Sequence, residues 1–456
     1  MPEARAVLLH CGDAVYAREF FEREAAEVVK GLGETGLELT QRFMILDGAG
    51  SAEAAKSIDL KNVDLIIVHL ISWHITPYVM AALKNAKDVP VLVWSIGGRT
   101  DGNGRLHSPA APAGLTALLP VLSEMGYKCR AICQKPDEGY RFGEILRFAR
   151  VAAAYGKVRN SRIGFVGYAD MGLYSCAYDK MSVYKSLGIE TEEYFSYEIG
   201  KLMESYTAEE TERQSEEIKG KFLFENEVSQ ITLDKVSRLY LALKSKCDLN
   251  GLSAISIKCV TGVTKHMGVN PCMAQSLLAG GDVSVICECD AMGLITTMML
   301  NALSGKTATF LEHYEFYDDS ILIGTCGFLP YGLADGEPRA RSANLGDFFV
   351  GLSNVSRMKP GLVTLARLYK KGDGYGMFLT KGEAHRPPKW IELGWKEPLP
   401  DFPSLLVKTE MPVTRYVENV PGQHIIVVYG DYTAEVRELC ALMGIVVKGE
   451  AGNGME

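Results

Sequence analysis

The stretch VSVICECDAMGLITTMMLNALSGKTATFLEHYEF, residues 283–316, carries the pattern that decides the fold. It begins with a short apolar run that predicts a buried strand over 283–288. A longer apolar segment then predicts a helix that ends at Gly305, and a second apolar run leads to Glu312. Buried strands that alternate with helices along a chain are typical of a parallel sheet covered by helices.

The same alternation extends towards the N-terminus. Strand-like apolar runs, with helical patterns such as 17–32 between them, occur at AVLLH (6–10), LIIVHL (65–70), VPVLVW (89–94), RIGFVGYADMG (162–172) and AISIKC (254–259). We therefore expect an α/β chain with two tandem doubly wound parallel-sheet domains, an N-terminal one over 1–160 and a central one over 161–335.

The pattern changes after about residue 335. A polar segment is followed by VTLARLYKKGDGYGMFLTKGEA (363–384), which predicts two strands joined by a Gly/Asp turn. HIIVVYGDY (424–432) predicts another strand. These runs indicate a β-rich C-terminal domain over 336–456.

Composition excludes several classes of protein. The chain has 456 residues, enough for about three domains, and its net charge of −8 comes without any block of Lys and Arg. A nucleic-acid or anionic-membrane surface is therefore not expected. The N-terminus lacks a signal-peptide pattern and no apolar run reaches 18 residues, so we expect a cytoplasmic protein without a membrane partner.

The 11 cysteines are an odd number scattered along a chain without a secretory signal, which indicates reduced, mostly buried thiols. Cys287 and Cys289 flank Glu288 at a spacing unlike that of common zinc sites. A Gly-rich loop over 95–109 lies at the carboxyl edge of its strand, where it is either a ligand-binding loop or a plain connection. No dinucleotide fingerprint or P-loop occurs, so no nucleotide cofactor is expected.

Three residues form the candidate chemical site. Glu288 closes one apolar strand, Glu312 ends the next apolar run, and His424 opens the strand over 424–432. A carboxylate at the end of a buried strand is costly unless it is paired or bound to a metal ion. Two such carboxylates and an imidazole suit a divalent ion. Strand-end acids are frequent, so spacing alone leaves the metal hypothesis open.

The segment CECDAMGLITTMMLNALSGKTATFLEHYEF resembles the signature of the L-fucose isomerase family. In that family a Glu-x-Asp leads into a Gly-containing apolar helix, and a strand with a second acid follows. Here the second acid, Glu312, falls 24 residues after Glu288. GTCGFLP (324–330) is similar to a Cys-Gly-x-x-Pro element of relatives, and His424 is similar to the family's C-terminal histidine ligand.

By this resemblance, Glu288, Glu312 and His424 bind Mn²⁺, or another divalent metal, and the two acids also move protons. The reaction implied is aldose–ketose isomerisation of a small free sugar, a pentose or a 6-deoxyhexose. This reaction transfers a proton between C1 and C2 through an enediol, and a divalent ion stabilises the charge that develops on the oxygens. Two carboxylates with different pKa values can serve as base and acid.

The chain departs from the family at two positions. The second acid is Glu312 where fucose isomerases usually have Asp, and Thr325 stands where many relatives have His before Cys-Gly. These changes leave open an epimerase or lyase reaction on a sugar or sugar acid. A non-catalytic sugar-binding protein is a further alternative, although simple sugar binding needs no metal-binding triad. For Asp290, helix N-capping is favoured over catalysis.

Two more residues are candidates for substrate contact. Trp73 follows the strand over 65–70, and in fucose isomerases an N-terminal aromatic residue reaches a neighbouring subunit's active site. The resemblance therefore implies a homotrimer or homohexamer with shared sites. Lys258 ends the strand at 254–259, where it either contacts a substrate oxygen or lies on the surface.

Overall fold

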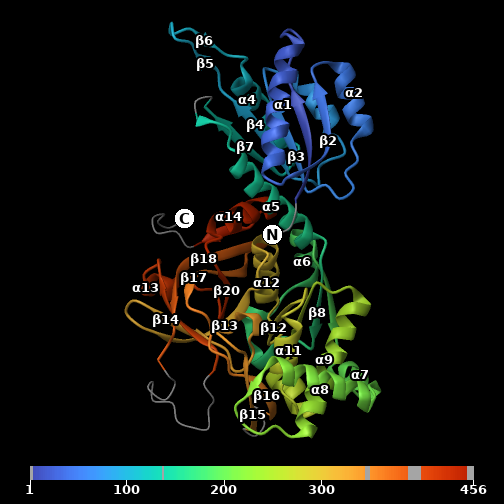
Figure 1. Cartoon of the computed structure of the whole chain (residues 1–456), viewed down its shortest axis with the longest axis vertical. Helices are drawn as coiled ribbons and strands as arrows, with labels where there is room; N and C mark the ends of the chain where they lie inside the picture. Colours follow the sequence, from blue (N-terminus) through green and yellow to red (C-terminus); the bar gives the residue numbers. More distant parts are fainter. Residues whose placement is uncertain (1–3, 136–137, 345–349, 389–401, 449–456) are drawn as a thin grey trace. The chain divides into compact units, whose positions relative to one another are not determined.

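The computed structural model describes residues 4–135, 138–344, 350–388 and 402–448. The chain divides into two compact units, Met1–Lys157 and Val158–Glu456, which are described separately below (Figure 1). None of the helices in the described ranges is long and apolar enough to cross a membrane.

The first unit is built on a parallel sheet. In the described part of the chain its strands lie in the order β2-β1-β3-β4-β7, and all neighbours are parallel. Because β2 and β3 lie on opposite sides of β1, the strand order reverses there, as in doubly wound folds. The strands are β1 (Arg5–Cys11), β2 (Glu38–Ile45), β3 (Leu65–Leu70), β4 (Val91–Ile96) and β7 (Cys129–Gln134).

Helices connect these strands. The predicted helix at 17–32 is α1, which follows Ala17, and the Gly-rich loop after β4 forms a short antiparallel hairpin. Its strands are β5 (Arg99–Thr100) and β6 (Leu106–His107), and the helices of this part of the chain are α1 (Arg18–Glu34), α2 (Gly48–Ser57), α3 (Thr76–Ala82), α4 (Ala111–Glu124) and α5 (Phe142–Arg159).

A second parallel sheet opens the Val158–Glu456 unit, with strand order β12-β11-β8-β9. Its strands are β8 (Arg162–Val166), β9 (Glu190–Tyr194), β11 (Ala254–Ile257) and β12 (Ser284–Cys287). The segments around it are η2 (Asp170–Gly172), η3 (Tyr174–Cys176), α6 (Lys180–Leu187), α7 (Ser196–Ser205), α8 (Ala208–Lys221), α9 (Gln230–Asn250), η4 (Cys259–Thr264), α10 (Lys265–Met267), α11 (Cys272–Leu278) and α12 (Ala291–Ser304). The prediction of parallel α/β sheets is thus confirmed.

The rest of this unit is dominated by a closed β-barrel. Its strands follow the order β17-β20-β13-β14-β19-β18, with β21 beside β18, and the pairing of β17 with β18 closes the ring. These are β13 (Thr309–Phe316), β14 (Ile321–Gly324), β17 (Gly361–Lys371), β18 (Gly374–His385), β19 (Ser404–Thr409), β20 (His424–Tyr429) and β21 (Val446–Lys448). Smaller elements are β10 (Leu223–Phe224), η5 (Tyr331–Leu333), β15 (Arg339–Asn344), β16 (Val350–Asn354), α13 (Val413–Asn419) and α14 (Thr433–Met443).

Sequence patterns explain the barrel in part. The apolar runs at 363–384 form β17 and β18 around a Gly372–Asp373 turn, as expected. The barrel also takes β13 and β14 from the segment before residue 335, because β13 pairs with β20. The sheet of β8–β12 and the barrel belong to one compact unit, so the division into three domains stays a prediction.

The cysteines are all unpaired by disulfides, and most are buried. Cys133 is an exception and is exposed. It lies in β7, the edge strand of the first sheet, where successive side chains alternate between the two faces and this one points to solvent.

Candidate functional site

The three predicted ligands come from two different sheets. Glu288 directly follows β12, the edge strand of the parallel sheet, whereas Glu312 lies in β13 and His424 begins β20. Glu312 and His424 are directly opposite each other in the antiparallel β13–β20 pair. Residues opposite each other in such a pair project from the same face, so the barrel itself sets these two side chains side by side.

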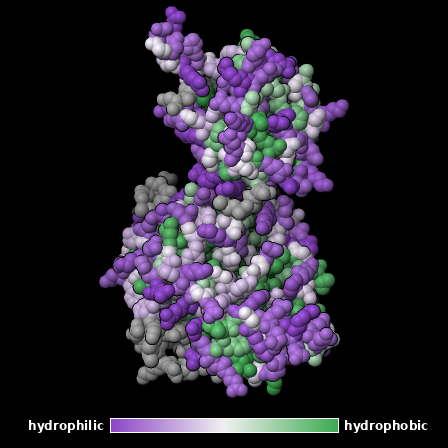
Figure 2. All heavy atoms as spheres, in the orientation of Figure 1, coloured by the Kyte–Doolittle hydropathy of each residue, from purple (hydrophilic) through white to green (hydrophobic). Residues whose placement is uncertain are grey.

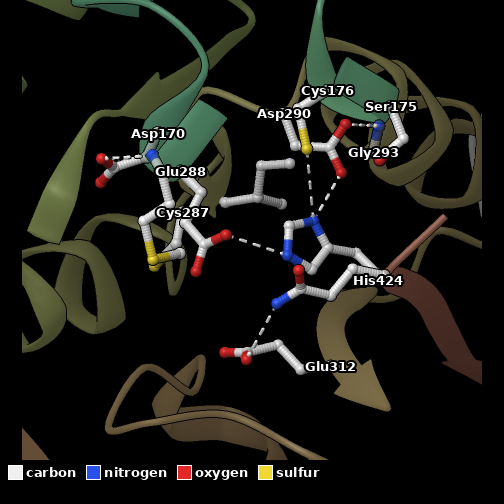
Figure 3. Close-up of polar contacts among 12 residues, drawn as sticks. Asp170, Ser175, Cys176, Cys287, Glu288, Asp290, Gly293, Glu312 and His424 are labelled. Atoms are coloured by element: carbon white, nitrogen blue, oxygen red, sulfur yellow. Dashed lines mark hydrogen bonds and ion pairs between the residues drawn. The ribbon is translucent and has the colours of Figure 1, made fainter. Parts of the chain in front are cut away.

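The Glu288 carboxylate and the His424 imidazole face each other (Figure 3). Glu288 Oε2 lies 3.0 Å from His424 Nε2, and both side chains are almost fully buried. Neither atom has a hydrogen-bond partner in the described residues, because their mutual orientation does not meet hydrogen-bond geometry. At 3.0 Å the two groups form an ion pair when His424 is protonated, and both atoms are of the kind that bind metal ions.

The backbone that carries Glu288 is strained. Glu288 and Cys289 have φ angles of 67° and 50°, in the left-handed region that residues other than glycine seldom adopt. The Glu288 carbonyl is held there by a hydrogen bond of 3.0 Å from the Asp170 N–H. Strain of this kind persists only where the surrounding structure enforces it, and it is concentrated at functional sites.

Glu312 has an unusual protonation equilibrium. Burial, together with the charge of nearby Glu288, raises the pKa of Glu312 to about 7. The carboxylate accepts a hydrogen bond of 3.4 Å from the Gln423 side-chain amide. A carboxyl group with a pKa close to neutral pH can both hold and release a proton there.

Asp290 orients the histidine from behind. Its carboxylate accepts a hydrogen bond of 2.8 Å from His424 Nδ1, and this contact leaves Nε2 directed towards Glu288. The same carboxylate accepts two hydrogen bonds from Arg367, of 2.5 and 3.2 Å, and caps α12 through the Gly293 N–H at 2.9 Å. Burial works to raise the pKa of Asp290, but the Arg367 charge and His424 hold it well below its usual range.

The expected cap at Asp290 is therefore confirmed, and the residue also has a second role in this buried network. All three groups, Asp290, Arg367 and His424, are fully buried. A carboxylate that orients a histidine through one ring nitrogen while the other nitrogen is free is the usual support of a metal-binding histidine.

Cys176, Asp290 and His424 also have ligand atoms within 4.8 Å of one another and could hold a metal ion. The contacts argue for a different position. The Asp290 oxygens already accept from four donors, and Cys176 Sγ approaches His424 at Nδ1, the nitrogen that is bound to Asp290. Glu288, Glu312 and His424 Nε2 combine two carboxylates with an imidazole nitrogen that contacts Glu288, and donors of these types suit Mn²⁺ and similar ions.

The other predicted site residues lie elsewhere. Trp73 follows β3 in the Met1–Lys157 unit, and its side chain is partly exposed. Lys258 follows β11 and is buried, not a surface lysine. Among the described residues its ammonium group contacts Tyr168, Ala169 and Asp170 and none of the three proposed ligands.

Thr325 belongs to a turn. It is fully buried, its hydroxyl donates to the Phe328 carbonyl and its N–H to the Pro403 carbonyl at 2.9 Å. The two cysteines beside Glu288 also have other partners: Cys287 donates to Gln275 and Cys289 to the Val166 carbonyl. In the described structure, Thr325, Cys287 and Cys289 are therefore not part of the group of proposed ligands.

Comparison with known proteins gives a consistent result. No protein-family profile matches the chain. A sulfoquinovose isomerase of Priestia aryabhattai is 25% identical over 406 residues, 86% of this chain and 86% of that protein. Sulfoquinovose isomerases of Alkalicoccus urumqiensis and of a Clostridium species are 23% and 21% identical, over 84% and 85% of this chain and 85% and 86% of theirs. These relatives support a sugar isomerase.

Sequence reasoning missed three members of the site: Arg367, Gln423 and Cys176. Arg367 did leave a signal, because a single arginine stands in the apolar run VTLARL that forms β17. A charged side chain in the middle of a buried strand requires a buried partner. Gln423 precedes His424 in a turn, and Cys176 lies in a short η3 turn, so nothing in their local sequence marks them.

The Arg367–Asp290 pair gives a stability prediction. Asp290→Asn keeps the side-chain size but leaves the Arg367 charge buried without a counter-ion, so we expect a loss of about 3–5 kcal/mol in the free energy of unfolding. Arg367→Met in the same chain should restore much of this loss, because it removes the unpaired charge. Urea denaturation measures both effects.

The matched control is Asp319→Asn, which breaks the exposed pair with Lys408 and should change stability little. If Asp290→Asn is no more harmful than this control, the buried pair does not stabilise the site as described.

Proposed function

We propose that this chain is a metal-dependent aldose–ketose isomerase that acts on a small sugar. The observation that carries the proposal is the buried contact of 3.0 Å between Glu288 Oε2 and His424 Nε2, with Glu312 opposite His424 in the barrel. Glu288, Glu312 and His424 would hold the ion, as the resemblance to L-fucose isomerases implies. Mn²⁺ is the ion we propose.

The names of the relatives suggest the substrate class. Sulfoquinovose is a glucose derivative in which a sulfonate replaces the hydroxyl group at C6. It is therefore a 6-deoxyhexose with a charged end, within the class expected from the sequence. We propose a 6-deoxy-6-sulfo sugar as the substrate and its ketose as the product.

The two carboxylates divide the proton transfers. A bound divalent ion would polarise the oxygens on C1 and C2 and so stabilise an enediol. Glu312, whose pKa is about 7, would take the proton from C2 of the aldose and return it to C1 of the ketose. Glu288 would assist the proton shift between the two oxygens. Asp290 would keep the His424 ring in one orientation throughout.

Assembly is part of the proposal. Several large apolar side chains around the carboxyl ends of β8 and β9 and in the following segments are exposed: Tyr168, Tyr174, Met181, Tyr184, Phe195 and Tyr197. Figure 2 shows separate hydrophobic patches on an otherwise hydrophilic face. Exposed apolar groups in such number often mark an interface. We propose a homotrimer or homohexamer in which Trp73 of one subunit serves a neighbouring site.

Metal binding tests the ligand assignment. Glu288→Gln and His424→Ala should each lose most of the bound metal and of the isomerase activity, while circular dichroism shows an unchanged fold. Glu315→Gln, an exposed acid on the same strand β13, is the matched control and should keep both. Atomic absorption and a ketose assay give the two readouts. Full metal content in both site variants would refute the assignment.

Heavy water tests the chemical step. A proton held on Glu312 can exchange with solvent before it returns, so the ketose formed in heavy water should carry deuterium at C1. Glu312→Gln should abolish this exchange together with turnover, because the proton carrier is gone. A hydride shift moves hydrogen directly between the carbons. A deuterium-free product from an active enzyme would therefore contradict the roles of both acids in proton transfer.

Light scattering tests the assembly. The active protein should have the mass of a trimer or a hexamer, and Trp73→Ala should lower turnover without changing the metal content, because Trp73 belongs to substrate contact and not to the metal site. Full activity in a monomeric fraction would be incompatible with shared sites.

A further inference from the structure

A cavity of about 410 Å³ opens at the carboxyl edge of the second parallel sheet. Its walls come from the residues that follow β8, β9 and β11, and they include Gly167, Tyr168, Tyr194, Lys258, Gly262 and His266. The strand order of this sheet reverses at β8, between β9 and β11. Open α/β sheets bind ligands outside the carboxyl ends of their strands at such a reversal.

None of the three proposed ligands is among the described residues that line the cavity, but the register of the sheet brings its lining residue Lys258 close to Glu288. Cys287 of β12 is in register with Ile257 of β11, and Ile257 with Val166 of β8. The residues that follow are Glu288, Lys258 and Gly167. They therefore stand in a row across the sheet edge, one strand spacing of about 4.8 Å apart.

Asp170 contacts both the proposed ligand Glu288 and the cavity residue Lys258. Its N–H donates to the Glu288 carbonyl at 3.0 Å, and its carboxylate lies 3.4 Å from Lys258 Nζ. Figure 3 shows the first of these contacts. The position of the lysine is thus tied to that of the proposed ligand.

The Lys258 ammonium group is buried but poorly satisfied. Only 8% of the residue is exposed, yet the polar contacts of its ammonium group within the described residues are long: 3.4 Å to Asp170 and 3.5 Å to the Ala169 carbonyl. The Tyr168 ring lies 3.9 Å from the charge. An ammonium group has three N–H donors and forms charge-assisted bonds of about 2.8 Å when a strong acceptor is present.

Asp170 does not supply that acceptor, because other donors occupy it. Its carboxylate accepts from the Val260 N–H at 2.7 Å, from the Met171 N–H at 2.9 Å, and from the hydroxyl and N–H of Thr261. The negative charge is consequently shared among several bonds, and Lys258 retains the capacity to bind an anion.

Two glycines make room for the lysine stem. A Cβ on Gly167, whose φ is 99°, would come within 2.8 Å of Lys258 Cβ, and a Cβ on Gly262 within 3.0 Å of Lys258 Cγ. Both glycines line the cavity. A side chain at either position would have to displace the lysine, so the walls are shaped around it.

The charges around the cavity form two pairs. Glu193 is its one acidic lining residue among those described, and it is neutralised by Lys180 at 3.0 Å and by a hydrogen bond from Tyr178. Lys258 is the buried cation of the second pair, 3.4 Å from Asp170, and His266 also lines the cavity. A sulfonate has the size and charge to bind Lys258 in this cavity. The aromatic rings of Tyr168 and Tyr194 are suited to pack against the carbon atom that carries the sulfonate.

We propose that this cavity binds the sulfonate end of the sugar substrate, and that Lys258 is the residue that selects a charged sugar over a neutral one. The inference rests on the proposed function, because it assumes that C1 and C2 lie at Glu288 and Glu312. The rest of the carbon chain would extend along the sheet edge, from Glu288 past Asp170 to Lys258.

Calorimetry on the Mn²⁺-loaded protein tests the proposal without relying on turnover. Sulfoquinovose should bind the wild type more tightly than 6-deoxyglucose does, and Lys258→Met should reduce this preference roughly 10- to 100-fold. Lys258→Arg should restore much of it, because the charge returns. Lys265→Met is the matched control: Lys265 is exposed in the neighbouring α10, does not line the cavity, and should leave the preference unchanged.

Inorganic sulfate separates substrate binding from a site for free anions. Sulfate should compete with sulfoquinovose in the wild type and lose this effect in Lys258→Met. If sulfate binds at Lys258 but does not weaken the binding of sulfoquinovose, the proposal is overturned in favour of a separate anion site.

Other results of the calorimetry also test the inference. A wild type without preference for the sulfonated sugar, or a Lys258→Met variant that is folded and keeps the full preference, would overturn the inference even if the enzyme isomerises sugars. If Lys258→Met does not fold, Lys258→Gln and the sulfate competition in the wild type provide the same decision. Preference without any isomerisation would contradict the proposed function and support the cavity assignment.

Discussion

The candidate site depends on one buried ion pair, between Asp290 and Arg367. Asp290 caps the N-terminus of α12, the helix that comes after β12 of the parallel sheet, while Arg367 lies in β17 of the barrel. The two charges have no access to solvent and meet through two hydrogen bonds. Neither charge would be tolerated there alone, so the pair restrains how the sheet and the barrel can pack against each other. His424, bound to the same carboxylate, takes its orientation from this contact.

This arrangement places unlike groups around one space. From the parallel sheet comes Glu288, held on a strained backbone, and from the barrel come Glu312 and His424 at opposite positions of one strand pair. Burial removes the water that would solvate the Glu312 carboxylate, and Glu288 adds a nearby negative charge. Both effects raise the pKa of Glu312, to about 7. The same low-dielectric surroundings make an isolated carboxylate costly, so a buried carboxylate needs a cation or another partner.

Part of the architecture follows from local pattern. The alternation of apolar strands with helices predicted the parallel sheets, and the Gly/Asp turn at 372–373 predicted the hairpin of β17 and β18. Strands without a continuous apolar run were missed, among them β2, in which only Ile45 is buried, and β15, whose sequence RARSAN is largely polar. Cys133 illustrates a further limit, because an apolar run does not tell an edge strand from a central one.

The sequence by itself determined the chemical types at the site: a strand that ends in Glu288, a helix capped by Asp290, and an apolar run with Glu312. It could not determine that β13 pairs with β20, that Arg367 reaches Asp290 across 77 residues of chain, or that Lys258 lines a cavity. Local propensity acts over a few residues, whereas strand pairing and the burial of charge depend on which apolar faces meet after the chain has closed the barrel. Only the tertiary structure decided which residues would share one space.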